Sequence, residues 1–248
     1  MADIKPFRAF RPSRDKVHLI ASRSYISYKK KDLKSKLDEN PFTFLHVLNP
    51  DYKNPEKNAA NSVSHFKRVN EKFLEFVAEQ NLVRDKEKSF YLYRQIKDGH
   101  PYVGIIGCAS VEDYNNRVIK KHEATIAFRE EIFKNYLNLV EINAEPVCFT
   151  YPNQREIDKI TNRILLQFPE YDFTTTNRVR HSFWLIDNAE AVANITKYFE
   201  GVDSLYIADG HHRSASSALL GNELKAKNPN HKGDENYNYF KLYAKVFI

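Results

Sequence analysis

Residues 205–213 read LYIADGHHR, and residues 214–220 continue as SASSALL. The apolar run before the glycine predicts a buried strand, and the small residues after it predict a helix that packs closely on its neighbours. Gly210, at the corner between them, is one of only 7 glycines in the chain. We therefore expect a positive φ or a close backbone contact there. The segment predicts a strand, a tight turn and a helix, in that order.

Other periodic segments extend this pattern along the chain. Predicted helices cover residues 31–39, 55–80, 128–143, 156–168, 189–199 and 211–226. Predicted strands cover residues 17–21, 42–48, 90–96, 102–111, 146–151, 181–186, 205–208 and 239–248. Lys97, Asp98 and Gly99 form a hairpin signal between two of the strands, residues 4–14 read as an extended arm, and residues 113–117 read as a polar turn. This mixture predicts an α/β fold of the mixed, α+β kind.

Composition narrows the class of protein. The chain has 248 residues, of which 42% are hydrophobic and 28% charged, so it is too apolar for a disordered protein and long enough for one or two domains. A net charge of +6, from scattered lysines and arginines, favours small anionic partners over nucleic acid. Two cysteines, Cys108 and Cys148, lie in apolar runs and read as buried thiols. With no apolar leader and no run of membrane-spanning length, we expect a cytoplasmic protein without a membrane partner.

The corner at 209–213 carries the residues best suited to chemistry. The amides at a helix start attract anions, and Arg213 adds a fixed phosphate donor. His211 and His212 are suited to donating hydrogen bonds or moving protons, and Asp209 to binding an amine, a hydroxyl or a metal-bound water. The plainer alternative is that Asp209 caps the helix and the histidines satisfy backbone groups. A P-loop or a dinucleotide-binding loop needs glycine spacings that this corner lacks.

A second polar cluster lies in residues 118–125, VIKKHEAT. Glu123 beside His122 is suited to the role of general base or metal ligand, and Lys120 and Lys121 to neutralising a phosphate. The same four residues are also an ordinary surface sequence, so alone they favour the plainer interpretation. Considered together with the cluster at 209–213, they favour the interpretation as part of a functional site.

The run at 209–213, preceded by Tyr206, Ile207 and Ala208, resembles the signature of the domain-of-unknown-function family 1015. Further matches to that family occur in the same order along the chain, at residues 4–8, 40–46, 93–95, 119–125 and 145–147. The resemblance covers almost the whole chain. Members of the family extend past the point that matches Ile248, so we expect the sequence to be a piece of a longer protein.

That family is distantly similar to the ParB/sulfiredoxin superfamily, which includes free serine kinases. The resemblance implies a mixed-sheet catalytic core at residues 86–248, with a helical insertion near 128–199, and an N-terminal α/β portion at residues 1–85. It implies that Glu123 is the catalytic base, with His122 and Asp209 in the catalytic set. Gly210, His211, His212 and Arg213 would then bind nucleotide phosphates together with Lys120 and Lys121. ADP or ATP with Mg²⁺ would be the cofactors, and no side chain is assigned as a resident metal site.

Three functions follow from these features. The leading hypothesis is a phosphotransferase of the free serine kinase type, which moves phosphate between a nucleotide and serine or phosphoserine. The second is a nucleotide-binding regulator without turnover. The third, a DNA-binding protein, is the least favoured because no predicted helix concentrates lysine and arginine. The expected partner is a small phosphorylated metabolite, and a homodimer is left open.

Overall fold

The computed structural model describes residues 1–54 and 61–246. The chain divides into two compact units. The first, the sheet unit, comprises Met1–Arg8, Lys86–Lys134 and Pro146–Ile248; the second, the helical unit, comprises Ala9–Asp85 and Asn135–Glu145. Helices and strands alternate along the chain, and the predicted mixed α/β class is confirmed.

A nine-stranded sheet forms the centre of the sheet unit. Its strands are β1 (Ile4–Lys5), β4 (Phe90–Lys97), β5 (His100–Ser110), β6 (Ile119–Lys120), β7 (Val147–Tyr151), β8 (Tyr171–Thr174), β9 (Arg180–Ile186), β10 (Leu205–Asp209) and β11 (Tyr239–Val246). Their order is β6-β10-β7-β11-β5-β4-β9-β8, with β1 also paired to β5. Most pairs are antiparallel, but β10 runs parallel to β6 and β11 runs parallel to β7.

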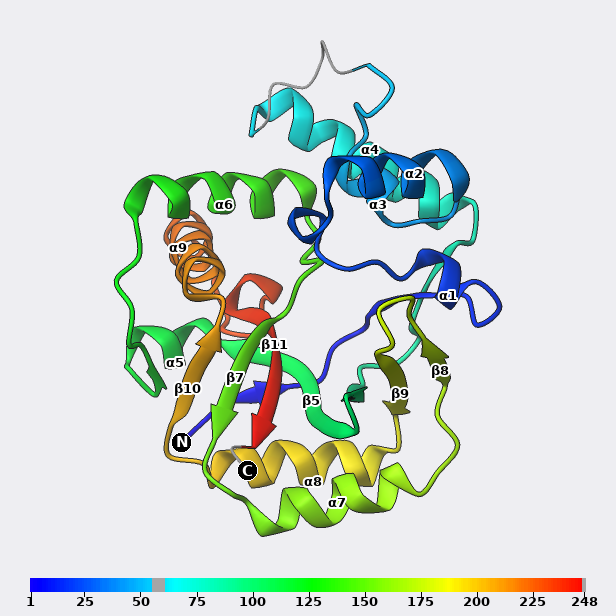
Figure 1. The fold of residues 1–248 in the computed structure, drawn as a ribbon. Coiled ribbons are helices and arrows are strands. Elements are labelled where there is room, and N and C mark those ends of the chain that lie inside the picture. Colours follow the sequence, from blue (N-terminus) through cyan, green and yellow to red (C-terminus); the bar gives the residue numbers. More distant parts are fainter. Residues whose placement is uncertain (55–60, 247–248) are drawn as a thin grey trace. The chain divides into compact units, whose positions relative to one another are not determined.

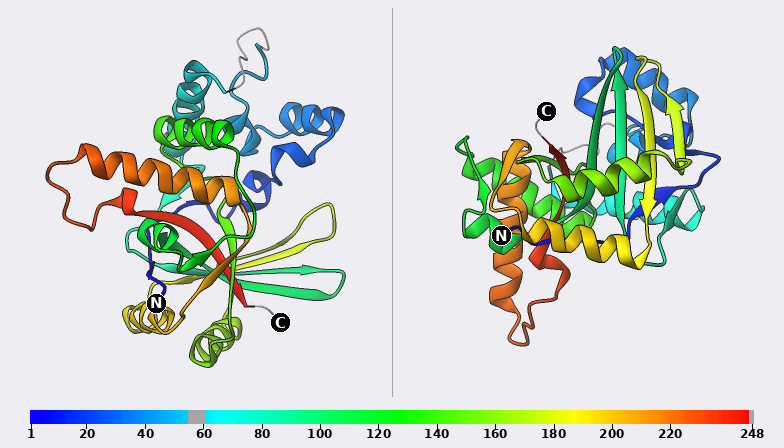
Figure 2. Two further views of the ribbon diagram at one scale, coloured as in Figure 1. Left: turned by 90° about the vertical axis from the view of Figure 1, so that its left-hand side faces the viewer. Right: turned by 90° about the horizontal axis from the view of Figure 1, so that it is seen from below.

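The predicted hairpin between β4 and β5 is confirmed. Asp98 has a φ of 50° and Gly99 a φ of 81°, and positive values at both central residues define the two-residue turn that matches the twist of paired strands. The β8–β9 hairpin lies beside it, because β4 pairs with β9 (Figure 2).

One face of the sheet is covered by helices that share its core. These are α5 (Val111–Asn115), α7 (Arg155–Leu165), α8 (Ala189–Glu200) and α9 (His211–Lys227). Val147, Phe149 and Ile207 of the strands are buried with Ile157 of α7 and Phe199 of α8. Helices α7 and α8 lie side by side (Figure 1). Small buried side chains on α9, including Ala215, Ser216 and Ala218, produce the close packing that the sequence predicts.

The helical unit is built mainly from short helices. They are α1 (Val17–Ile20), η1 (Tyr25–Ser27), α2 (Lys30–Glu39), α3 (Leu45–Leu48) and α4 (Val63–Ala78), and a small sheet pairs β2 (Phe10–Pro12) with β3 (Leu82–Arg84). The longest helix, α4, begins after Ser62, whose hydroxyl accepts from the His65 amide. It buries an apolar stripe of Phe66, Val69, Phe73 and Phe76. The helix α6 (Ala127–Val140) is divided between the two units.

Two predicted strands are wrong. Residues 17–21 and 42–48 contain the short helices α1 and α3 instead. The second case has a local cause, since the Asn40 side chain accepts from the Phe42 amide and turns the chain just before α3. Short apolar runs do not distinguish a strand from one buried helical turn. The predicted start of the long helix, at residues 55–60, lies outside the described residues.

Several short elements escape the sequence prediction. The expected arm at residues 4–14 contains the paired strands β1 and β2, and the expected turn at 113–117 overlaps helix α5. Strands β3, β6 and β8 were not predicted, because two to four residues are too few to show a period. Within the span 128–199, β7 and β9 lie where the sequence predicts strands, and β8 is an addition to them. Cys108 and Cys148 form no disulfide in the described part of the chain.

A buried carboxylate anchors the helical unit. Asp51 is 3% exposed, and it accepts hydrogen bonds from Arg68 Nη2 at 2.7 Å and from His65 Nδ1 at 2.9 Å. The Arg68 guanidinium holds the pKa of Asp51 below its usual value. Because the folded pKa is depressed, the charge stabilises the fold above the unfolded pKa, and this stabilisation is lost as the pH falls through the folded value.

We predict that Asp51→Asn lowers the free energy of unfolding by about 2–4 kcal/mol at neutral pH, because it breaks a buried ion pair. The difference from the wild type should begin to shrink as the pH falls below the unfolded-state pKa of an aspartate, about 3.9, and should disappear as the pH passes through the lower pKa of folded Asp51. Urea unfolding measures both effects. The control is Asp38→Asn, which removes an exposed carboxylate that pairs with Lys34 and should move the midpoint little. Equal midpoints for the two variants would contradict the anchoring role of Asp51.

Candidate functional site

The candidate site is the corner at which β10 passes into α9 (Figure 1). Gly210 stands at this corner with a φ of 95° and a ψ of 34°, in the left-handed region. A Cβ at this position would lie 2.8 Å from Val147 Cγ1 of β7. The glycine is therefore required both by its positive φ and by close contact, as the sequence predicts.

The start of α9 has no side-chain cap. Gly210 occupies the N-cap position, no side chain caps the helix, and its first turn contains no acidic residue. The first amides of a helix have no partner inside the helix, so those of His211, His212 and Arg213 present the positive end of a 17-residue helix. The plainer alternative, with Asp209 as the cap, does not describe this corner.

Asp209 and Arg213 instead bind one another. Arg213 Nη2 donates to Asp209 Oδ2 at 2.6 Å, and Arg213 Nη1 donates to the Pro146 carbonyl at 3.0 Å. These two bonds fix the guanidinium beside the first turn of α9. The pair stays accessible, since the Asp209 side chain is 75% exposed and the Arg213 side chain 25% exposed.

The parallel pairing of β6 with β10 brings the second cluster to the same corner. Tyr206 lies opposite Lys120, so the residues that follow each strand emerge at the same edge of the sheet. Glu123 Oε2 lies 3.3 Å from His211 Nδ1. The rings of His122 and His211 meet edge to face, with centroids 4.4 Å apart. The structure thus unites two clusters that are far apart in the sequence.

The two lysines of the second cluster are placed differently. Lys120 and Lys121 are exposed. The Lys121 amine lies 3.4 Å from the centroid of the Tyr114 ring on α5, and burial followed by the Arg117 charge lowers its pKa. Among the described residues, no hydrogen bond or ion pair joins either lysine to residues 209–213.

Both histidines of the corner carry a ring nitrogen without a partner. His211 is 7% exposed. Within the described part of the chain, His211 Nε2 and His212 Nδ1 are buried and form no hydrogen bond. Burial, and next the neighbouring His122, lower the pKa of His211, which favours its neutral form. Buried polar atoms are rarely left unsatisfied in native proteins, so these two nitrogens suggest a ligand or ordered water in the functional state.

Two parts of this corner escaped sequence reasoning. The Pro146 carbonyl binds Arg213, and Val147 forms the wall against Gly210. The resemblance to the family includes residues 145–147 but assigns them no role. Hydrophobic pattern predicts β7 but cannot show that its first residue faces the glycine, because that contact depends on the register of β7 and β10.

Neither a metal cluster nor a membrane-spanning helix occurs in the described part of the chain. Among residues 1–54 and 61–246, no three His, Cys, Asp or Glu side chains converge as a metal site. A cation at the corner would therefore need ligands from a bound phosphate as well. Within the same residues, each helix is too short or too polar to cross a bilayer.

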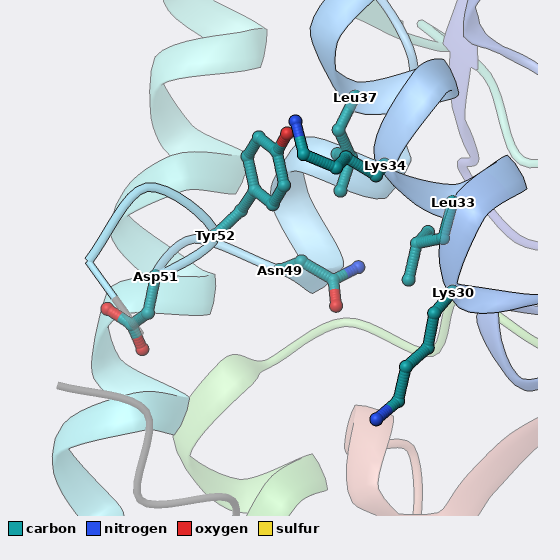
Figure 3. Close-up of a pocket in the computed structure, with 7 residues that line it drawn as sticks. All are labelled: Lys30, Leu33, Lys34, Leu37, Asn49, Asp51 and Tyr52. Atoms are coloured by element: carbon teal, nitrogen blue, oxygen red, sulfur yellow. The ribbon is translucent and has the colours of Figure 1, made fainter. Parts of the chain in front are cut away.

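The helical unit holds a separate pocket of about 270 Å³ (Figure 3). It is lined by Lys30, Leu33, Lys34, Leu37, Asn49, Asp51 and Tyr52. Asp38 accepts hydrogen bonds from both Lys34 and Tyr52, and Asp51 is bound by Arg68 and His65. With these charges already paired and a mostly aliphatic wall, the pocket is a weaker candidate than the corner.

We predict that Gly210→Ala destabilises the protein by about 2–4 kcal/mol, because it adds a left-handed Cβ and a clash with Val147. The matched control is Gly99→Ala, which has a positive φ of 81° but nothing within 4 Å of its Cβ, and should lose only about 1–2 kcal/mol. In a double-mutant cycle, Val147→Ala and Gly210→Ala together should cost less than the sum of the two single losses, because the truncation of Val147 removes the clash. Urea unfolding checks these three values, and equal losses for both glycine variants would argue against the close contact.

No curated protein and no solved structure matches the chain. One family does, and its match covers residues 4–244 of the 248, which includes the corner, the second cluster and segment 145–147. The chain belongs to the family described as "Protein of unknown function (DUF1015)".

Proposed function

We propose that this protein is a phosphotransferase of the free serine kinase type, which binds nucleotide phosphates at the start of α9. One observation carries the proposal. A long helix begins without a side-chain cap, beside a fixed arginine and two buried histidine nitrogens that have no partner among the described residues. Amides, guanidinium and imidazole are all donors to phosphate oxygens, and they meet here within one turn of helix.

Each residue of the corner has a role in this proposal. The amides that follow Gly210 and the Arg213 guanidinium bind the phosphate that is transferred. His212 Nδ1, when protonated, donates to a phosphate oxygen. Lys120 and Lys121 are exposed, and contribute a positive potential that attracts the nucleotide rather than a direct bond.

The cofactors of the proposal are ADP or ATP with Mg²⁺. No side chain of the corner is assigned as a metal ligand, and the oxygens of the bound nucleotide would hold the Mg²⁺ ion. The ion would neutralise charge on the transferred phosphate. The protein itself would position the nucleotide.

The acceptor in the proposal is the hydroxyl of serine. The distant similarity to ParB/sulfiredoxin-type kinases supports it through the order of the two clusters, with Glu123 before the 209–213 turn. The contact between Glu123 and His211 adds to this, because it brings a carboxylate of the first cluster to the phosphate-binding turn of the second. In this scheme Glu123, with His122 beside it, receives the hydroxyl proton.

A nucleotide-binding regulator without turnover is the second candidate. One observation favours it: the Glu123 side chain is 61% exposed, whereas a general base is usually shielded from bulk water. The two functions are separated by incubating the full-length protein with L-serine and ATP or ADP, and with phosphoserine and ADP or AMP. A kinase forms phosphoserine or the reverse product; a regulator binds nucleotide and forms neither. Absence of both turnover and nucleotide affinity would rule out both.

We predict that Arg213→Lys weakens ADP and ATP binding tenfold or more, because lysine keeps the charge but loses the planar, two-nitrogen donor. Isothermal calorimetry at fixed salt measures the affinity. The control is Arg163→Lys on the exposed side of α7 in the same unit, which should bind as the wild type does. Equal affinities for both variants would count against phosphate binding by the guanidinium, and melting temperatures recorded in parallel detect any loss of fold.

A further inference from the structure

We propose that His211 Nε2 is the atom that accepts the hydroxyl proton of the acceptor, and that Glu123 is a positioning residue that orients the His211 ring. This inference rests on the proposed phosphotransferase function and changes its chemistry, because it moves the base from the carboxylate to the imidazole. It concerns a hydroxyl-bearing acceptor in general, of which serine is one.

The tautomer of His211 is set by its contact with Glu123. Its Nδ1 lies 3.3 Å from Glu123 Oε2. An ionised carboxylate only accepts hydrogen bonds, so the favoured neutral tautomer carries its proton on Nδ1, facing Glu123. The other nitrogen, Nε2, then holds a lone pair. A carboxylate that orients a histidine in this way is the arrangement found in catalytic triads.

The lone pair on Nε2 lacks a donor. Within the described residues Nε2 is buried and forms no hydrogen bond. A buried acceptor without a donor destabilises the protein, and a bound hydroxyl relieves this by donating to it. Glu123, by contrast, is 61% exposed, so bulk water competes for its oxygens. The shielded atom is the better placed of the two to take a proton from a bound substrate.

The surroundings of His211 keep it neutral and therefore able to accept a proton. Burial, His122 and His212 all lower its pKa, while Glu123 and Asp209 raise it, and the net direction is down. The position of His211 at the start of α9 also lowers its pKa, because the N-terminus of a helix disfavours a cation. Glu123 opposes these effects only in part, and it stabilises the imidazolium once the proton has moved.

The proposed step transfers one phosphoryl group to the acceptor and one proton to His211. The acceptor oxygen attacks the terminal phosphorus of ATP or ADP, and its proton passes to His211 Nε2. The bond from that phosphorus to the bridging oxygen breaks, and ADP or AMP leaves with the electron pair. The imidazolium then releases its proton to solvent, which restores the neutral ring.

The tautomer can be tested without any turnover. Nitrogen-15 NMR of the full-length protein distinguishes a protonated Nδ1 from a protonated Nε2. We expect His211 to be neutral with the proton on Nδ1 at pH 7, and to lose this preference in Glu123→Gln. His231, which lies 3.0 Å from Glu235 outside the corner, provides the internal reference. A proton on Nε2 in the wild type would overturn the proposal.

The catalytic part is tested with His211→Asn and His211→Gln, which place an amide near the Nδ1 and Nε2 positions respectively but cannot accept the proton. Both should lower kcat/KM for phosphoserine formation by about 10²–10⁴-fold, with ADP affinity within about threefold of the wild type. His231→Asn should leave both unchanged. Glu123→Gln should keep measurable turnover and move the acidic limb of the kcat/KM profile to lower pH, because a negative charge beside His211 is removed.

The outcomes separate the two proposals. Turnover in the wild type with less than a tenfold loss in both His211 variants overturns the role of His211 and leaves the kinase function standing. Loss of all turnover in Glu123→Gln with full activity in His211→Asn returns the base to Glu123. A wild type that neither turns over nor binds nucleotide overturns the kinase function itself, and the proton transfer with it.

Discussion

The left-handed backbone of Gly210 is the constraint on which the site depends. It turns the end of β10 directly into α9 and brings the chain against Val147, so close that a single methyl group would not fit. Because the turn is so tight, the first amides of α9 emerge at the sheet edge beside Arg213. The guanidinium is held there by Asp209 and the Pro146 carbonyl. Electrostatic preorganisation of this kind requires no rearrangement when an anion arrives.

A second constraint is the parallel pairing of β6 with β10. It spans only two residues of β6, yet it brings His122 and Glu123 to the edge where Asp209 ends its strand. The resulting contacts all converge on the His211 ring. Burial and the neighbouring histidines His122 and His212 favour the neutral ring, and we propose that Glu123 sets its orientation. The chemistry that we propose depends on the two ring nitrogens of His211. Nδ1 faces Glu123, and Nε2 is the atom proposed to accept the proton.

The sequence predicts the parts of this structure that local rules determine. Gly210 was predicted to need a positive φ, the β4–β5 turn followed from Asp98 and Gly99, and the small residues of α9 indicated close packing. Segments 17–21 and 42–48 were misassigned because short apolar runs fit either element. The wall at Val147, the Pro146 carbonyl and the two-residue strand β6 could not be predicted, since each depends on sheet register between distant segments. Only the family resemblance indicated that Glu123 and the 209–213 turn belong to one site.

The most direct test of the proposed phosphate binding at this corner is a titration of the protein with ADP, monitored through the backbone amide signals of His211, His212 and Arg213. Amides that donate to a phosphate shift downfield and saturate with the occupancy of the site. We expect these three signals to shift in a saturable way, while the Gly99 amide, in the β4–β5 turn, stays unchanged. Saturable binding of ADP that shifts other amides and leaves these three in place would contradict the account.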